Sequence, residues 1–406
     1  MKTLILPFIL VSAVPAWSQS SATLTYAQVA AAVDAANPEL AAARARARAA
    51  GSRFVQAWTP ASPVFELERE GAATTRSPLD GPEKTWGVRQ EFDLPTASYL
   101  KGKAAAAGAG AADAEAARTR RAVLMKARKA FAVLRLVWVE KDLIAQNVEI
   151  VRRVARVAES KVSAGKAGQA DALKAQVELS KLQGLHEFKE HEIHVAEAEL
   201  SALMGRELGP FARPEDPSEP AVPAEGELQR RASTMNPMLR AAVLEDRRAA
   251  AEAGLAKAEL LPKLMLQYRR RRAPMTGTTH DAVAGFTVPL WIWSPAARIK
   301  EASESRTAAR ADAEGARLAT MAGVRSTLGH WTAAVRLSEV YRTAILPQAE
   351  SALRTAEAAY QSDRGGFLDL LDAQRSLLEL TLEHERLRAE AQMHRGELED
   401  MVGQEL

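Results

Sequence analysis

The chain has 406 residues, of which 47% are hydrophobic but only 5% aromatic, and its 54 basic and 51 acidic residues leave a net charge of +3. So balanced a charge excludes a general affinity for nucleic acid, and the absence of cysteine excludes disulfides, thiolate metal sites and lipid attachment through a thiol. Alanine dominates the hydrophobic residues, which indicates helices packed closely through small side chains.

The first 19 residues have the organisation of a signal peptide. Lys2 is the charged start, residues 4–14 form an apolar run, and Ala16-Trp17-Ser18 supplies a small-residue cleavage site. We therefore expect the mature protein to be exported. No later segment approaches the roughly 20 apolar residues that a membrane-spanning helix requires, so an inner-membrane helical protein is not expected.

The first repeat, residues 20–208, is expected to begin with a helix at 26–58 that prolines end. A β-hairpin follows at about 63–95, because residues 64–70 alternate between glutamates on one face and Phe65 and Leu67 on the other. A long helix pair is expected at about 96–205. Its first helix, at 1.5 Å per residue, would reach roughly 100 Å.

A proline-rich acidic linker, residues 209–225, separates this unit from a second one at 226–406. The second unit is expected to contain a helix at 227–260, a hairpin at about 262–290 and a long helix pair at about 295–403. Pro347 predicts a kink or a helix start within that pair.

The two units are copies of each other, since residues 346–406 match an earlier stretch at a constant offset of 198. Asn37-Pro38 also recurs as Asn236-Pro237. Many residues are identical between the copies, and among them Asp171, Leu173, Ala175, Gln176, Leu179, Leu182, His186, Glu187, Leu200, Gly205, Glu207 and Leu208 recur as Asp369, Leu371, Ala373, Gln374, Leu377, Leu380, His384, Glu385, Leu398, Gly403, Glu405 and Leu406.

The four expected strands fit either a soluble sheet packed on helices or a share of a membrane barrel. Strands of about ten residues are long enough to cross a bilayer at a tilt. A ladder of glutamates opposite aromatic residues favours a water-filled barrel. Four strands cannot close a barrel, so a spanning protein would have to oligomerise, and three copies would supply twelve strands. The fold class is therefore mainly α with a small β part.

The order of elements, together with the segment from Tyr360 through Asp363 to Gln374, resembles the TolC-type outer membrane efflux factors over the whole mature chain. This resemblance implies a homotrimer with a 12-stranded β-barrel in the outer membrane lipid and an α-helical tunnel through the periplasm. It also implies a periplasmic adaptor (membrane fusion) protein and an inner-membrane pump as partners, with the RND type as the candidate pump. The protein would be a passive exit duct without a cofactor, serving heavy-metal cations or other small molecules.

Charged residues near the hairpin tips are the candidate gate. Asp369 and Asp372 are three residues apart and share a helix face, and the resemblance implies that they line the periplasmic constriction as rings of carboxylates. Copy one has Asp171 at the first position but Lys174 at the second. The sequence therefore leaves open whether Lys174 contacts Asp372. Solvated charges at a helix end are the alternative interpretation.

The turns of the two long hairpins are the candidate docking surface for the adaptor. The resemblance places the docking contacts at Gly165, Gly168, Gly365 and Gly366. Glycine at such a turn would supply a positive φ and expose backbone to a partner. The family's glycine is displaced here, with Asp363 near its expected place.

Other features have two interpretations each. His186, His191 and His194 do not share one helix face, so a solvated face is favoured over a metal site. Residues 269–272, four consecutive arginines, could meet lipopolysaccharide phosphates or form a plain basic loop. Trp291 and Trp293 suit an interfacial belt or buried packing equally.

Two rival functional classes have less support. An enzyme is not expected, because the chain has no His-Glu zinc motif, phosphate-binding loop or nucleophile elbow. A periplasmic coiled-coil adaptor or scaffold shares the long hairpins, but it would be expected to carry one hairpin between compact β domains.

Overall fold

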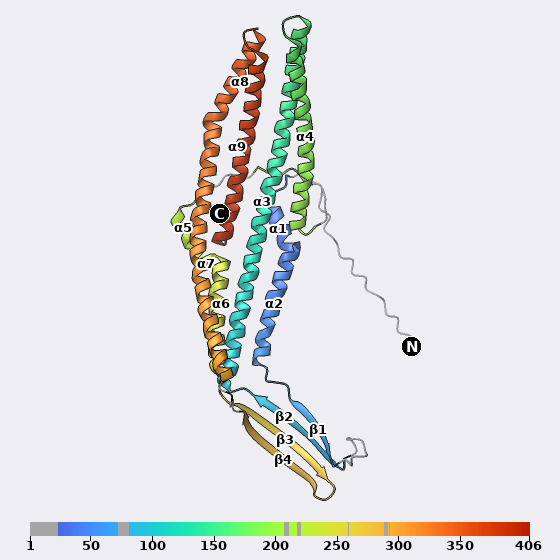
Figure 1. Ribbon diagram of the computed structural model, residues 1–406, viewed down its shortest axis with the longest axis vertical. Helices are drawn as coiled ribbons and strands as arrows, with labels where there is room; N and C mark the ends of the chain where they lie inside the picture. The colour runs from blue at the N-terminus through green and yellow to red at the C-terminus, as the bar shows by residue number, and fades with distance from the viewer. Residues whose placement is uncertain are drawn as a thin grey trace, which may run out of the picture.

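The computed structural model describes residues 23–71, 81–206, 211–216, 221–258, 260–287, 291 and 293–406. The expected signal peptide and the expected strand end at residues 288–290 lie outside the described residues. The described chain is elongated, with long helices running from hairpin tips at one end to a β-sheet at the other (Figure 1).

Each repeat contributes a pair of short helices, a β-hairpin and a long helical hairpin. In the first repeat these are α1 (Tyr26–Ala36), α2 (Pro38–Trp58), β1 (Val64–Glu70), β2 (Glu83–Phe92), α3 (Pro95–Ser163) and α4 (Gln169–Leu203). In the second they are α5 (Glu225–Met235), α6 (Pro237–Ala258), β3 (Lys263–Ala273), β4 (Gly277–Thr287), α7 (Trp293–Val340), η2 (Tyr341–Ile345), α8 (Leu346–Gln361) and α9 (Phe367–Val402).

The helices expected at 26–58 and 227–260 were wrong as single elements, because each is broken at its Asn-Pro step. Asn37 accepts a hydrogen bond from the Leu40 amide at 3.0 Å, which caps α2, and donates one to the Leu203 carbonyl at 2.7 Å. Asn236 caps α6 in the same way and donates to the Met401 carbonyl at 2.6 Å. A proline at the first helical position suits such a start. The break therefore fastens the short helices to the end of the returning long helix.

The second long helix is interrupted where Pro347 indicated a kink. Five residues, Tyr341–Ile345, form a π-helical turn directly before it. Proline lacks an amide hydrogen and its ring crowds the carbonyl four residues earlier, so the helix relaxes to a wider turn there.

The four strands form one antiparallel sheet in the order β1-β2-β3-β4, which is also the order of the chain. The central pair, β2 and β3, joins the two repeats, with Trp86 opposite Arg270. In the described residues β1 and β4 each pair on one side only, so both edges of the sheet are open within a protomer.

The sheet has one apolar face and one polar face, as the glutamate ladder predicted. On the apolar face Phe65 and Leu67 are each 77% exposed, and the register places them beside Val88 and Trp86. The same face continues with Phe92, Leu264, Leu266, Tyr268, Ala282, Ala284 and Phe286. On the polar face Gln267 donates a hydrogen bond to Glu66 at 2.8 Å, and Arg89 forms an ion pair with Glu66.

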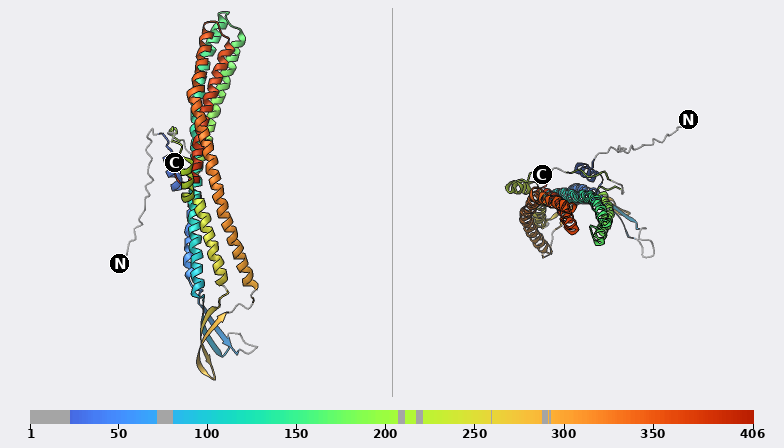
Figure 2. Two further views of the ribbon diagram at one scale, coloured as in Figure 1. Left: turned by 90° about the vertical axis from the view of Figure 1, so that its left-hand side faces the viewer. Right: turned by 90° about the horizontal axis from the view of Figure 1, so that it is seen from above.

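The hydrophobic core is distributed along the helices rather than gathered in one place. Four separate clusters of buried side chains are spread along the rod. Those around Leu134 and Val324 occupy equivalent places in the two repeats, and those around Val151 and Leu371 lie further towards the tips. Seen end-on, the long helices lie along an arc that is open on one side (Figure 2).

No helix in the described ranges is both long enough and apolar enough to cross a lipid bilayer.

Candidate functional site

The two hairpin tips lie side by side at the end of the molecule remote from the sheet (Figure 1). The backbone is nearly the same in both turns. Gly165 and Asp363, which are related by the offset of 198, have left-handed φ values of 68° and 58°. Gly168 and Gly366, also related by that offset, precede α4 and α9 in an extended conformation, with φ of −77° and −76°.

The positive φ expected at the tip glycines is found at one position of four. Only Gly165 has the positive φ, because Asp363 holds that conformation in the second repeat. Gly365 is needed for space instead, since a Cβ there would lie 2.8 Å from the Cβ of Ala359. Around Gly165 and Gly168 a Cβ would meet no atom within 4 Å, so these two glycines leave open backbone at the surface.

The predicted gate carboxylates lie in the first turns of the two returning helices. Asp369 is exposed and accepts a hydrogen bond from the Gly366 amide at 3.2 Å, which caps α9. Asp372 is exposed one turn further along the same face. Asp171, the counterpart of Asp369, is half-buried, and Lys174 is exposed.

No ion pair joins Lys174 to Asp372 among the described residues of the protomer. A different pair links the two hairpins here: Arg375 of α9 donates a hydrogen bond to Glu178 of α4. The Glu178 carboxylate, with a further contribution from Asp372, raises the pKa of Arg375. Glu178 is buried together with Ala175, Leu179 and Leu182 on one stripe of α4. A charged residue on an apolar stripe of the sequence indicates that its carboxylate has a partner.

The tips themselves are bridged by a lysine of the first repeat. Lys161 forms an ion pair with Asp363 at 2.6 Å, and its ammonium lies 4.1 Å from the ring centre of Tyr360. Lys166 lies 3.6 Å from the second oxygen of Asp363. The hydrogen bond from Lys161 lowers the pKa of Asp363, whereas burial raises the pKa of Tyr360.

A buried charge network joins the two repeats near the middle of the long helices. Arg135 of α3 binds Asp216 at 2.7 Å and Glu385 of α9 at 2.9 Å, and Arg388 binds the same two carboxylates. Burial alone would raise the pKa of Asp216, but the hydrogen bond from Arg388 and the charges of both arginines outweigh it and lower that pKa.

Glu140 forms a second buried junction a turn further along α3. Lys189 of α4 lies 2.6 Å from its carboxylate and Arg386 of α9 lies 3.1 Å away. Three helices from two repeats therefore meet at one carboxylate.

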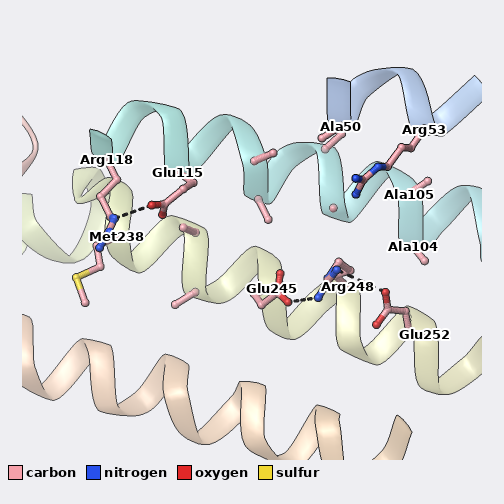
Figure 3. Close-up of a pocket in the computed structure, with 16 residues that line it drawn as sticks. Ala50, Arg53, Ala104, Ala105, Glu115, Arg118, Met238, Glu245, Arg248 and Glu252 are labelled. Atoms are coloured by element: carbon pink, nitrogen blue, oxygen red, sulfur yellow. Dashed lines mark hydrogen bonds and ion pairs between the residues drawn. The ribbon is translucent and has the colours of Figure 1, made fainter. Parts of the chain in front are cut away.

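Two further features are the histidines of α4 and a cleft between three helices. Within the described ranges no group of three metal-ligating side chains comes together, and His194 contacts Glu197 at 3.2 Å on its own helix. A cleft of about 600 Å³ lies between α2, α3 and α6 (Figure 3). Half of its 16 lining residues are alanines, and Arg118 pairs there with Glu115 and Arg248 with Glu245. It is a gap between closely packed helices.

Comparison with known proteins gives a family match in the second repeat and a relative over part of the chain. Residues 228–404 match the family described as outer membrane efflux protein. The cobalt-zinc-cadmium resistance protein CzcC of Cupriavidus metallidurans is 24% identical over 248 residues, which are 60% of this chain and 58% of that protein.

Solved structures share the fold. The outer-membrane channel OprN superposes with a TM-score of 0.79 at 19% identity, over 93% of this chain and 89% of that one. VceC of Vibrio cholerae superposes with a TM-score of 0.79 at 18% identity, over 94% of this chain and 96% of that one. CusC superposes with a TM-score of 0.81 at 14% identity, over 93% of this chain and 92% of that one. With two helix-hairpin repeats and a four-stranded sheet, the chain has the fold of these solved structures, and its second repeat matches the outer membrane efflux protein family.

Proposed function

We propose that the protein is the outer-membrane channel of a tripartite efflux system and acts as a passive exit duct. The observation that carries this proposal is the sheet. It has an exposed apolar face, a polar face and two open edges, a combination that is stable in lipid only when neighbouring copies close the edges. Three protomers would supply twelve strands for a barrel and six helical hairpins for a tunnel.

The proposed location is the outer membrane, with the helices extending into the periplasm towards a periplasmic adaptor and an inner-membrane pump of the RND type. The duct needs no energy source of its own, because the pump drives export. Divalent metal cations are the first candidate cargo, since the relative CzcC is described as a cobalt, zinc and cadmium resistance protein.

Fractionation of cells tests the proposal. An outer-membrane oligomer that dissociates only on heating is the expected result, and a soluble periplasmic monomer would rule out the duct. Deleting the gene and comparing sensitivity to cobalt, zinc and cadmium with sensitivity to dyes and antibiotics tests the cargo separately.

We further propose that Asp369 and Asp372 form two rings of carboxylates at the tip end of the tunnel, with Asp171 and Lys174 beside them. Both aspartates are exposed on one face of α9, as a pore lining requires. Rings of like charge attract cations and repel anions. Replacing both by lysine should lower cation conductance about tenfold in planar bilayers, in the range expected for a charged constriction. Unchanged conductance and selectivity would refute this gate.

For adaptor docking we propose the open backbone at Gly165 and Gly168, with Gly366 at the equivalent place in the second tip. Gly365 has a packing role within its own turn. A Gly168→Trp variant should lose co-purification with the adaptor, whereas Gly184→Trp, which also has open space on α4 but lies well away from the tip, should retain it.

A further inference from the structure

The apolar face of the sheet ends in a cluster of cations at the end remote from the helices. Arg69, Lys84 and Arg272 lie in one row across β1, β2 and β3, because each is directly opposite the next. Arg270 lies two residues closer to the helices, opposite Trp86 and His280. Strands are about 4.8 Å apart, so the row of three spans roughly 10 Å. All four side chains of this outward cation cluster are exposed.

The outward cation cluster has no carboxylate on its own face of the sheet among the described residues. Strand alternation places the nearest acidic residues, Glu68, Glu70, Glu83 and Asp281, on the polar face. Cations directly opposite one another destabilise a sheet unless something neutralises them. The polar face differs, since Arg89 there is paired with Glu66. An anion from outside the protein is the missing partner.

The residues beside the outward cation cluster indicate what kind of anion this is. Next along the strands come aromatic side chains, with Trp86 and Tyr268 packed edge to face at 5.9 Å and the Tyr268 hydroxyl 2.6 Å from His280. The exposed apolar band follows, with Phe65, Leu266 and Phe286. Apolar, aromatic and cationic zones in this order match acyl chains, interface and headgroup of a lipid.

We propose that the outward cation cluster binds the phosphate groups of a phosphorylated glycolipid in the outer leaflet. The inference rests on the proposed function, because only a channel in the outer membrane presents this face to that leaflet. Arginine suits phosphate, since its planar guanidinium donates two parallel hydrogen bonds. The four consecutive arginines at 269–272 thus lie within β3 rather than in a basic loop, and alternation divides them between two environments.

This division supplies a matched control. Arg269 and Arg271 lie on the polar face, and the side chain of Arg269 crosses the sheet over Gly87, where a Cβ would lie 2.9 Å from its Cγ. A double substitution of Arg270 and Arg272 by glutamine removes the same charge from the same strand as a double substitution of Arg269 and Arg271. Only the first pair belongs to the proposed site.

The test measures binding of diphosphoryl lipid A to the purified full-length protein in detergent, by native mass spectrometry. The Arg270→Gln/Arg272→Gln variant should bind lipid A at least about tenfold more weakly, as expected for two lost charge-assisted contacts. The affinity of the Arg269→Gln/Arg271→Gln variant should stay within about twofold of that of the unmodified protein. Arg272→Lys, which keeps the charge, should retain most of the affinity. Equal losses in both double variants would overturn the proposal.

Two further measurements distinguish a lipid site from a free-anion site, and failure of the lipid site from failure of the proposed function. Inorganic phosphate at millimolar concentration should not displace lipid A, and displacement would show a free-anion site in place of a lipid site. Trimer assembly of every variant is followed on unheated gels. If the unmodified protein fractionates as a soluble monomer, the proposed function fails. If it is an outer-membrane trimer whose two double variants bind lipid A alike, only the lipid site fails.

Discussion

Polar contacts join the two repeats at several heights, and the contacts at mid-height differ in burial from those at the tips. At mid-height the side chains of Arg135 and Glu140 are 3% and 4% exposed and lie in networks that connect α3 to α9. At the tips the side chain of Asp363 is 51% exposed and its bridge to Lys161 faces water. Between the two lies Arg375, half-exposed, on the buried carboxylate of Glu178.

This gradient indicates which parts of the hairpins can separate. Removing one partner of a buried ion pair leaves a charge without compensation, whereas an exposed pair contributes little because water and salt screen it. The ion pairs therefore fix the hairpins to each other at mid-height and contribute less at the tips, where the proposed gate lies and apolar packing around Tyr360 and Leu371 remains. A widening of the tunnel would begin at the tips and pivot about the middle.

The largest expected effect comes from Arg135→Met, which breaks the mid-height junction. It should lower the free energy of unfolding by about 3 kcal/mol. This value is at the lower end of the range for breaking a buried ion pair, because Arg388 stays beside both carboxylates. The thermal midpoint of the helical circular dichroism signal measures it. Arg317→Met, which removes an exposed ion pair with Glu314 on α7, should leave the midpoint unchanged. Equal shifts in the two variants would contradict the difference in burial.

A smaller effect is expected from Glu178→Gln, which weakens the intermediate junction. Arg375 can turn to water, so the loss of stability should be about 1 kcal/mol, typical of one hydrogen bond. The hairpins should also separate more readily, and single-channel conductance should rise about twofold if this junction restrains the gate. Glu187→Gln, an exposed carboxylate on the same helix, is the control. An unchanged conductance would show that the pair Glu178–Arg375 does not restrain the gate.

The sequence was sufficient for features that depend on local periodicity. The offset of 198 and the alternating strands established the repeats and the four strands, since helical and strand patterns are properties of neighbouring residues. The Asn-Pro steps that break the short helices are also local signals, since asparagine before proline is a frequent helix start.

The junctions between the repeats could not be predicted in the same way. The partners Glu178 and Arg375 are not related by the offset, because Val177 and not Glu178 is the counterpart of Arg375. Which charges meet depends on the rotation of α4 and α9 about their axes, and no repeat of sequence encodes that rotation. The contact of Lys174 with Asp372, which the sequence left open, is not formed within the described protomer, and the pair Glu178–Arg375 lies one helical turn away.

Acid should release the bridge at the tips only below the ordinary titration range of an aspartate. Lys161 holds the pKa of Asp363 below its ordinary value of 3.8, so the bridge is intact above that pH and is lost as the pH falls through the lowered pKa. Conductance should therefore be constant from about pH 8 to pH 5 and should change only below about pH 4. In an Asp363→Asn variant the part of this change that belongs to the bridge should be absent. A step near neutral pH would contradict the assignment.

The smallest effect is expected where the two tips differ in a single residue at the same backbone position. Asp363→Gly restores the residue that the first repeat has at Gly165 and so relieves a left-handed conformation that aspartate tolerates and glycine prefers. It also removes the bridge to Lys161 and Lys166. The two changes oppose each other and both are small at an exposed site, so the thermal midpoint should not shift measurably. A loss as large as that of Glu178→Gln would show that the tips are held as firmly as the helices behind them, and the pivot at mid-height would no longer follow.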